Sequence, residues 1–595
     1  MADRKKRLEI IIYAILLLSC VLIGKLYYLQ IVYNQKYKLY SNRNSIRTTR
    51  LVPKRGRIFT ADNRIIAWNV HRYKLIMERC KRKDFDKNLQ LISQYISLSP
   101  QDLENINNSR QRHYSVIKDA LSWEEYSNIA MAFFKFNNLV IDSVYSREYF
   151  LPEEFCHICG YVTGNNNSLQ VLEGKSGVEL YFNEYLTGKL GNVMSEVNAA
   201  GKKIRTLETE PPTDGKDLRL TINSELQKYV HEIMSQEKAG ACVVLDMDGK
   251  ILAMVSVPTF DTNILSGRMN KSQWDAIIKN PQFPLLNRVI GCAYPPGSIF
   301  KIVIGYAALC EGVVTPKDRI FCSGGYLQDG HTFHCWNRSG HGWVNMVEAL
   351  SYSCDCYFFE VAKRLGIDRI AKYAKLFGYG SPTGIEICGE ISGLMPSREW
   401  KILRHGSLWK PYETLIVGIG QGAVLATLAQ TATMLGRLYS ENYGFTPHLV
   451  QDECMQEFIK ESESMEENPA EKIQAQKFDV AQKLNPTAAQ VIKEGLQRVC
   501  TSGTAARSCA APYGIAGKTG SSQVRRLKKS HVGIKQDKLE WKYRDHAFFA
   551  GVAPNPNPRY IVAVFVEHGG GGASVAAPIA RKVFDKLMEL SKNEN

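Results

Sequence analysis

The sequence predicts an α+β fold divided among several domains, with one apolar helix at the N-terminus. The chain has 595 residues, more than a single hydrophobic core usually holds. Hydrophobic residues make up 45% and charged residues 23%, a balance that excludes wholesale disorder and a polytopic membrane protein. Strand-like segments near residues 218–257 and 547–566 enclose a region of long helices. We therefore expect a membrane helix, an elongated mixed domain, and a larger domain with helices on an antiparallel sheet.

Residues 1–32 are expected to form a cytoplasmic tail and a single transmembrane anchor. Four basic residues at positions 4–7 precede an apolar run from Ile10 to Gly24, and further apolar residues continue to Val32. This length approaches the ~20 residues that a membrane helix needs, and the basic tail favours a cytoplasmic N-terminus. A cleaved signal peptide and a lipoprotein signal at Cys20 are the alternatives. The apolar run continues past this cysteine, which argues against both.

Residues 45–210 are expected to form the mixed N-terminal domain. The segment Thr48–Trp68 is extended and contains an Asp62-Asn63 turn, a pattern typical of a hairpin. An amphipathic pattern predicts helical structure over Asp119–Phe134. Pro211-Pro212, followed closely by Asp-Gly, marks the end of the domain.

Residues 215–590 are expected to form the larger domain. Its sequence predicts a helix over Ser224–Ser235 and a buried helix over Ile302–Leu309. Apolar runs rich in β-branched residues predict strands. These are Leu218–Ile222, Ala241–Leu245, Ile251–Val257, Ala547–Val552 and Tyr560–Val566.

Three short motifs of this domain carry potential chemistry. Ser298 and Lys301 form an S-x-x-K at the start of the buried helix, and this spacing allows the lysine amine to reach the serine hydroxyl. A lysine accepts that proton only where burial or a neighbouring cation favours its neutral form. Ser353-Cys354-Asp355 follows, and Lys518-Thr519-Gly520 lies near the C-terminus. S-x-x-K alone is a weak signal, so the order of all three motifs carries the prediction.

The three motifs resemble those of the penicillin-binding proteins and serine β-lactamases. Among class B members the chain is most similar to the penicillin-binding protein 2 branch, which cross-links peptidoglycan during cell elongation. The resemblance implies a pedestal domain over residues 45–210 and a transpeptidase domain over residues 215–590. Further matching segments are Arg55–Ile58, Gly177–Glu179, Gly340–Gly342, Ser392–Ser397, Gly418–Gly422 and Glu567–Gly571.

The resemblance implies a serine-type peptidoglycan D,D-transpeptidase that β-lactams inhibit, with a carboxypeptidase side activity. Ser298 would attack the D-Ala-D-Ala carbonyl of a stem peptide, and Lys301 would take its proton. Ser353 and Lys518 would relay a proton toward the leaving amine, and Asp355 would orient this network. Asp355 stands where asparagine is common, so it changes the charge of the site.

Two residues of the third motif and the serine that follows it are expected to bind the substrate. Thr519 would contact the substrate carboxylate, and Gly520 and Ser521 would line the site. The backbone N–H groups of Ser298 and Ser521 would form the oxyanion hole.

Cys322, Cys335, His341 and Cys354 form a C-x12-C-x5-H-x12-C pattern between the first two motifs. Three thiolates and an imidazole suit tetrahedral zinc. The spacing also leaves open His331, His334 or Cys356 as a replacement ligand, or a disulfide between Cys322 and Cys335. The resemblance favours zinc (Zn²⁺) in a structural role.

The net charge of +16 raises the question of an anionic partner. Lys and Arg are spread along the chain without a recognisable nucleic-acid module, so nucleic acid is not expected. The resemblance implies a single-pass protein of the bacterial inner membrane with its catalytic domain in the periplasm. It also implies a RodA-like glycosyltransferase and other elongation-complex proteins as partners.

Two other functions use the same sequence features. A β-lactam-hydrolysing or β-lactam-sensing homologue would carry the same three motifs, but no deacylating carboxylate motif or signalling module is recognisable. A non-catalytic scaffold for a cell-wall polymerase would not need an intact nucleophile, base and K-T-G.

Overall fold

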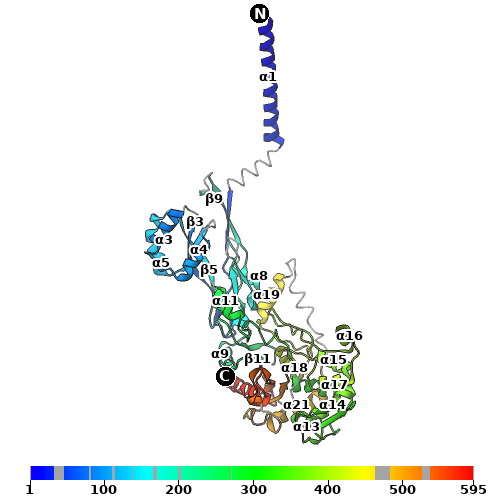
Figure 1. Cartoon of the computed structure of the whole chain (residues 1–595). Coiled ribbons are helices and arrows are strands. Elements are labelled where there is room, and N and C mark those ends of the chain that lie inside the picture. The colour runs from blue at the N-terminus through cyan, green and yellow to red at the C-terminus, as the bar shows by residue number, and fades with distance from the viewer. Residues whose placement is uncertain are drawn as a thin grey trace. The chain divides into compact units, whose positions relative to one another are not determined.

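A computed structural model describes residues 2–32, 46–78, 82–109, 114–136, 138–164, 171–198, 203–267, 269, 271–462, 483–524 and 536–593 (Figure 1). The chain divides into two compact units. One unit comprises residues 1–55, 165–171 and 187–215, and the other comprises the remaining residues. Residues 56–164, at the centre of the predicted N-terminal domain, group with the C-terminal part of the chain.

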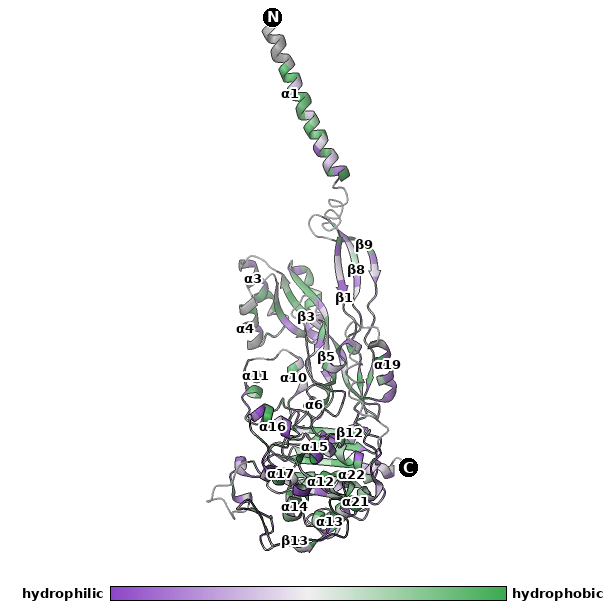
Figure 2. Ribbon diagram, turned by 90° about the vertical axis from the view of Figure 1, so that its right-hand side faces the viewer, coloured by the Kyte–Doolittle hydropathy of each residue, from purple (hydrophilic) through white to green (hydrophobic). Residues whose placement is uncertain are grey.

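The smaller unit begins with helix α1, Ala2–Tyr27, which continues as a short π-helix over Tyr28–Val32. The segment Ile10–Val32 has a mean hydropathy of 2.3, and none of its most apolar part is buried. It is long and apolar enough to cross a membrane, and Figure 2 shows its hydrophobic character. The helix runs through Cys20 without interruption.

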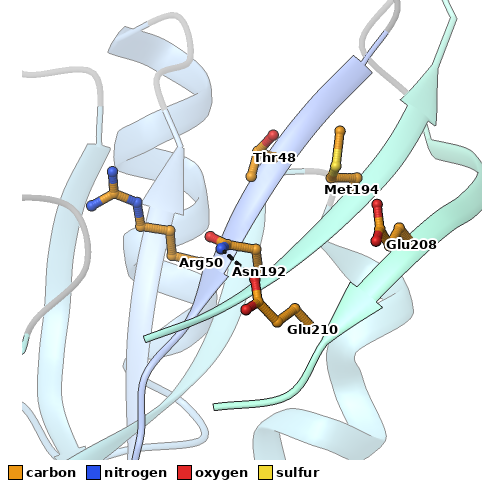
Figure 3. Close-up of a pocket in the computed structure, with 6 residues that line it drawn as sticks. All are labelled: Thr48, Arg50, Asn192, Met194, Glu208 and Glu210. Carbon is orange, nitrogen blue, oxygen red and sulfur yellow. Dashed lines mark hydrogen bonds between the residues drawn. The ribbon is translucent and has the colours of Figure 1, made fainter. Parts of the chain in front are cut away.

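A three-stranded antiparallel sheet follows in the same unit, in the order β1-β8-β9. Its strands are β1 (Ile46–Leu51), β8 (Gly191–Val197) and β9 (Lys203–Glu210). Every residue of β9 is exposed. A hollow of about 440 Å³ lies on this sheet. Arg50 lines it, and Figure 3 shows that its side chain points away from Glu208 and Glu210, which line it too. The other lining residues are Thr48, Asn192 and Met194.

The larger unit contains a five-stranded sheet in the order β10-β2-β3-β4, with β5 also paired to β3. The Asp62-Asn63 turn joins β2 to β3 as predicted, and Asn63 has a φ of 59° there. Helices α3 (Arg82–Ile92) and α4 (Pro100–Ser109) lie in the chain between β3 and β4, and α5 (Trp123–Ala132) lies between β4 and β5. The strands are β2 (Ile58–Phe59), β3 (Ile65–Glu78), β4 (Tyr114–Leu121), β5 (Leu139–Tyr149) and β10 (Leu218–Arg219).

The predicted helix over Asp119–Phe134 is wrong at its start, because β4 continues to Leu121. Ser122 then caps α5: its hydroxyl accepts the Glu125 N–H at 3.1 Å, and the Glu125 carboxylate accepts the Ser122 N–H at 3.0 Å. This capping box satisfies two backbone donors at the helix start and fixes where the helix begins. The predicted strand Leu218–Ile222 is also shorter than expected, and it pairs with β2 of this sheet.

A buried ion pair lies beneath this sheet. Arg147 on β5 donates to the Glu179 carboxylate at 2.7 Å, and both side chains are fully buried. Tyr149 donates its hydroxyl to the same oxygen at 3.2 Å. The short elements around it are α6 (Cys156–Cys159), β6 (Val162–Gly164), β7 (Leu172–Gly174), α7 (Gly177–Tyr181) and α8 (Asn183–Thr187).

A second five-stranded sheet, in the order β12-β11-β19-β18-β17, forms the centre of the C-terminal part. All its pairings are antiparallel, as predicted. The four strands predicted from apolar runs are observed to within a residue of their expected ends, and β17 at the edge is additional. The strands are β11 (Gly240–Asp246), β12 (Ile251–Val257), β17 (Ala516–Ser522), β18 (His546–Ala553) and β19 (Tyr560–Val566).

Alternate residues of this sheet enter two different cores. Val243 and Ala563 belong to the core that contains α12 (Lys301–Cys310), whereas Val244 and Val564 pack with α9 (Ser224–Met234) and α22 (Ala577–Asn593). The period of two along a strand explains this division. Other helices are α10 (Thr262–Ser266), α11 (Lys271–Ile278), α13 (Met346–Ser351), α14 (Asp355–Leu365), α15 (Ile367–Leu376), α16 (Arg398–His405), α17 (Pro411–Gly418), α18 (Leu428–Ser440), α19 (Asp452–Ser462) and α21 (Pro486–Thr501).

Two small two-stranded antiparallel sheets lie outside these larger sheets. Strands β13 (Ile320–Cys322) and β16 (Gly342–Val344) pair with each other, as do β14 (Gly325–Gln328) and β15 (His331–His334). Both lie in the chain between α12 and α13, so they separate the first catalytic motif from the second.

Candidate active site

Ser298 lies in a single 3-10 turn, Gly297–Phe300, that leads directly into α12. Gly297 has a φ of 56°, and its N–H donates to Gly420 O at 2.9 Å. A Cβ at Gly297 would lie 2.7 Å from Ser521 O. Glycine is therefore needed here, both for the left-handed backbone and for the close approach of β17. Ser298 is partly exposed at this junction, whereas the next two residues are buried.

Lys301 is fully buried one turn further along. Its Nζ donates to Ser353 O at 2.9 Å, to Ser353 Oγ at 3.2 Å and to Asp355 Oδ1 at 2.6 Å. An ammonium group has three hydrogens, so these three bonds account for all of them. The S-x-x-K spacing predicted that this amine can reach Ser298, but in the structure its hydrogens are directed to the second motif.

Ser353 occupies a strained turn between α13 and α14. Its φ is 54°, a conformation that costs roughly 1–2 kcal/mol for a residue with a Cβ. The Cys354 N–H donates to Ala349 O at 2.9 Å, which closes the turn in the manner of a helix C-cap. This conformation places the Ser353 hydroxyl and carbonyl oxygens on the same amine. Backbone strain of this kind is often found at functional sites.

Asp355 joins the buried amine to a neighbouring loop. One carboxylate oxygen accepts from Lys301, and the other accepts the Trp336 N–H at 2.9 Å. The Trp336 indole N–H donates to Tyr352 O at 3.0 Å, although 60% of the tryptophan is exposed. Trp336 holds this carboxylate through its backbone, a contact for which the sequence offers no signal.

Lys518 lies on β17 and is fully buried. Burial, and next the positive charge of Lys301, lower the pKa of its amine to about 7, and Asp355 opposes this shift. The amine donates to Thr519 O at 3.2 Å. At neutral pH it is therefore poised to accept or release a proton, as acid–base catalysis requires.

The other residues of the third motif, and Ser521 after it, lie beside the Ser298 turn at the edge strand β17. The Thr519 hydroxyl lies 3.0 Å from the Thr504 hydroxyl. Ser521 O accepts from Gln421 Nε2 at 3.3 Å, and Ser521 Oγ accepts the Gly572 N–H at 3.3 Å. A Cβ at Gly520 would lie 3.0 Å from Pro296 O, so the glycine admits this turn.

The structure thus brings Lys301, Ser353 and Asp355 into direct contact, with Lys518 close enough to be affected by their charges. Sequence reasoning did not single out Thr504, Trp336 or Gln421. Only Gln421 had a signal, since it lies within the glycine-rich segment Gly418–Gly422.

Four potential metal ligands gather beside the second motif. The ligand atoms of Cys322, Cys335, His341 and Cys354 all lie within 4.8 Å of one another, and the three thiols are buried. His341 Nδ1 is 3.6 Å from the sulfur atoms of both Cys322 and Cys335. Zinc–sulfur bonds of ~2.3 Å in a tetrahedron place sulfur atoms roughly 3.8 Å apart. The four side chains therefore suit a tetrahedral ion.

The spacing alone left open a disulfide between Cys322 and Cys335, or a replacement ligand. Cys322 and Cys335 are both free thiols. Hydrogen bonds from the Cys354 and Cys356 thiols lower the pKa of Cys335, which favours a thiolate within the cluster. Both His331 and His334 lie exposed on β15, outside the cluster.

Two family models match this chain. Residues 240–585 match the penicillin binding protein transpeptidase domain, and residues 50–220 match the penicillin-binding protein dimerisation domain. The chain is 35% identical to the peptidoglycan D,D-transpeptidase MrdA of Haemophilus influenzae, over 98% of this chain and 91% of that protein. It is 31% identical to the protein of the same name from Escherichia coli, over 98% of this chain and 94% of that protein.

Solved structures with similar folds include two named PBP2. The Helicobacter pylori protein in complex with MreC has a TM-score of 0.79 and 25% identity, over 92% of this chain and 99% of that one. The Pseudomonas aeruginosa protein in complex with WCK 5153 has a TM-score of 0.66 and 30% identity, over 91% and 96%. A peptidoglycan synthase complex that coordinates polymerization and crosslinking gives a TM-score of 0.68 at 28% identity, over 97% of both chains.

Proposed function

This chain belongs to the penicillin-binding proteins with a dimerisation and a transpeptidase domain, and from that premise we propose that it is an elongation-specific peptidoglycan D,D-transpeptidase. The observation that carries this proposal is the buried Lys301 amine, bound to Ser353 and Asp355 one turn from Ser298. The substrates would be stem peptides that end in D-Ala-D-Ala, and β-lactams would acylate the same serine.

Acylation begins with the transfer of two protons. Lys301 passes a proton to Asp355, its partner at 2.6 Å, and its free amine then accepts the Ser298 proton. Ser298 Oγ bonds to the carbonyl carbon of the penultimate D-alanine. The N–H groups of Ser298 and Ser521 stabilise the resulting oxyanion, a contribution of about 3 kcal/mol for a well-placed donor.

Collapse of this intermediate breaks the peptide bond and releases the terminal D-alanine. The leaving nitrogen takes the Ser353 hydroxyl proton, and Lys518 or Lys301 restores it through the same network. The amine of a neighbouring stem peptide then attacks the ester, forms the cross-link and frees Ser298. Attack by water instead of the amine would give the carboxypeptidase side activity.

The segment Ile10–Val32 supports a place in the bacterial inner membrane, with the catalytic domain in the periplasm. A RodA-like glycosyltransferase would supply the glycan strands, because neither matching domain is a polymerase. The solved complex of PBP2 with MreC and the peptidoglycan synthase complex support elongation-complex proteins as further partners.

Intact-mass spectrometry of the full-length protein tests the nucleophile. We expect benzylpenicillin to add one ring-opened β-lactam to the wild type and to Ser235→Ala, and nothing to Ser298→Ala. Ser235 is a suitable control because it also precedes a lysine by three residues. An adduct that persists on Ser298→Ala, or its absence from folded wild type, would overturn the proposal. Rapid turnover of nitrocefin would instead identify a hydrolase.

We also propose that Cys322, Cys335, His341 and Cys354 hold a structural zinc ion. Four protein ligands leave no position for a catalytic water. Cys354 lies between Ser353 and Asp355, so the ion would fix the turn that carries them.

Metal analysis of the purified protein tests this site. Cys335→Ser is expected to lower both zinc content and the acylation rate, whereas the exposed Cys388→Ser retains both. Wild-type protein that is prepared without chelator and contains no zinc would contradict this assignment.

A further inference from the structure

Thr504 contacts the third motif from a loop remote from it in sequence. Its hydroxyl oxygen lies 3.0 Å from that of Thr519. Its backbone N–H donates to Ser351 O at 3.2 Å, at the end of the helix that precedes Ser353. One residue therefore links the third motif to the end of the helix that leads into the second motif.

The loop that carries Thr504 is held tightly. A Cβ at Gly503 would lie 2.4 Å from Ser351 O, so only glycine fits there. The Gly503 N–H donates to Arg498 O at 2.7 Å, and the Ala505 N–H donates to Val499 O at 3.0 Å. These bonds fix the loop to the end of α21 and hold the Thr504 hydroxyl in place.

Either hydroxyl can be the donor in this contact, and the number of hydrogens determines what each direction leaves for a substrate. Each threonine hydroxyl has one hydrogen and accepts through its oxygen. If Thr519 donated to Thr504, it would have no hydrogen left for a substrate. If Thr504 donates, Thr519 keeps its hydrogen for an incoming anion.

We propose that Thr504 is a positioning residue that donates to Thr519 Oγ1 and directs the Thr519 hydrogen toward the terminal carboxylate of the acyl donor. This inference rests on the proposed function, in which Thr519 binds that carboxylate. Thr504 does not touch the substrate and acts through Thr519. Its effect is therefore confined to acyl donors that carry a free carboxylate.

Acylation by benzylpenicillin and by its methyl ester tests this role in the full-length protein. Thr504→Val removes the hydroxyl with little change in size. We expect it to reduce the second-order rate constant roughly five- to tenfold for the acid and less than about twofold for the ester. Thr504→Ser keeps the hydroxyl and should retain the wild-type ratio. Thr501→Val, a nearby control whose hydroxyl bonds to Gln497 O, should also leave the ratio unchanged.

A double-mutant cycle tests whether the effect passes through Thr519. Thr504→Val should cost nothing further in a Thr519→Val background, because the hydrogen it orients is already absent. Equal losses for acid and ester, or additive losses in the cycle, would overturn the inference. Thr504→Ala replaces the valine variant if the latter does not fold. Wild type that neither compound acylates would refute the proposed function itself, a separate outcome.

Discussion

At the residue scale, Lys301 and Lys518 are two buried amines whose charges affect each other. Lys301 has a carboxylate partner at 2.6 Å, whereas among the described residues Lys518 donates to the Thr519 carbonyl. Burial and the charge of Lys301 lower the pKa of Lys518 to about 7. The two lysines therefore differ in role because of their partners: one amine is held by an ion pair, and the other exchanges its proton near neutral pH.

The pH dependence of acylation follows from this difference. The acylation rate is expected to fall as pH increases through about 7, because Lys518 can restore the Ser353 proton only while its amine is protonated. Because Asp355 raises the pKa of Lys518, Asp355→Asn should move the midpoint to lower pH. Lys518→Arg, which stays charged, should lose this transition together with most of the rate. Rates measured at several pH values provide the check, and an unchanged midpoint in Asp355→Asn would contradict it.

The same shift makes a prediction about stability. The pKa of Lys518 is lower in the folded protein than its ordinary value of 10.5. Between about 7 and 10.5 the unfolded chain therefore binds a proton that the folded chain has lost, so this group makes stability rise with pH across that range. Lys518→Met should remove this contribution, which thermal unfolding of both proteins over the same pH range would measure.

At the element scale, the approach of the nucleophile's turn to β17 depends on glycines. Gly420 has a φ of 70°, and a Cβ there would lie 2.1 Å from Gly297 O. Gly406 has a similar φ of 61°, but a Cβ there would meet nothing within 4 Å. The two positions share the conformational constraint and differ only in the space available.

Alanine substitutions at Gly420 and Gly406 distinguish the effect of the left-handed backbone from the effect of the close approach to Gly297 O. Both variants should lose about 1–2 kcal/mol of stability from the left-handed conformation. Gly420→Ala should also displace the Ser298 turn and slow acylation roughly 100-fold, because reacting groups tolerate little misplacement. Gly406→Ala should be acylated normally. Thermal unfolding and acylation kinetics together would measure both effects, and equal acylation by the two variants would contradict the role of this contact.

The elements differ in how far sequence predicted them. Strands β11, β12, β18 and β19 follow from runs of β-branched and apolar residues. Strand β17 has the sequence Ala-Gly-Lys-Thr-Gly-Ser-Ser, which has low strand propensity. It is a strand because it pairs with β18, and its glycines admit the neighbouring turn. Sequence patterns do not encode such tertiary contacts.

The candidate site was predictable in its motif residues alone. Lys301, Ser353 and Asp355 stand in recognisable triplets, and the structure brings them into contact. Thr504 contributes a single hydroxyl and Trp336 a backbone N–H. Neither contribution produces a pattern of residue types, so only the fold reveals them.

At the scale of the whole molecule, the apolar N-terminal helix is far from the candidate catalytic residues in the sequence. It also belongs to the other of the two compact units. Deletion of residues 2–32 should release the protein into the soluble fraction without changing its acylation rate. A variant with the order of residues 10–32 shuffled should stay with the membrane, because insertion depends mainly on total hydropathy. Cell fractionation followed by β-lactam labelling would measure both properties. A deletion variant that sediments with membranes would contradict an anchoring role.

The order of strands in the central sheet also has a consequence for synthesis of the chain. Asp246 on β11 pairs with Tyr560 on β19, and β17 joins only through β18. A nascent chain, which emerges N-terminus first, presents Ser298 long before β17, β18 and β19 exist. Lys518 and Ser521, which the proposed mechanism combines with this serine, are made only when translation is nearly complete. We therefore expect incomplete chains to carry an unreactive serine, so that β-lactams label only chains whose synthesis and folding are complete.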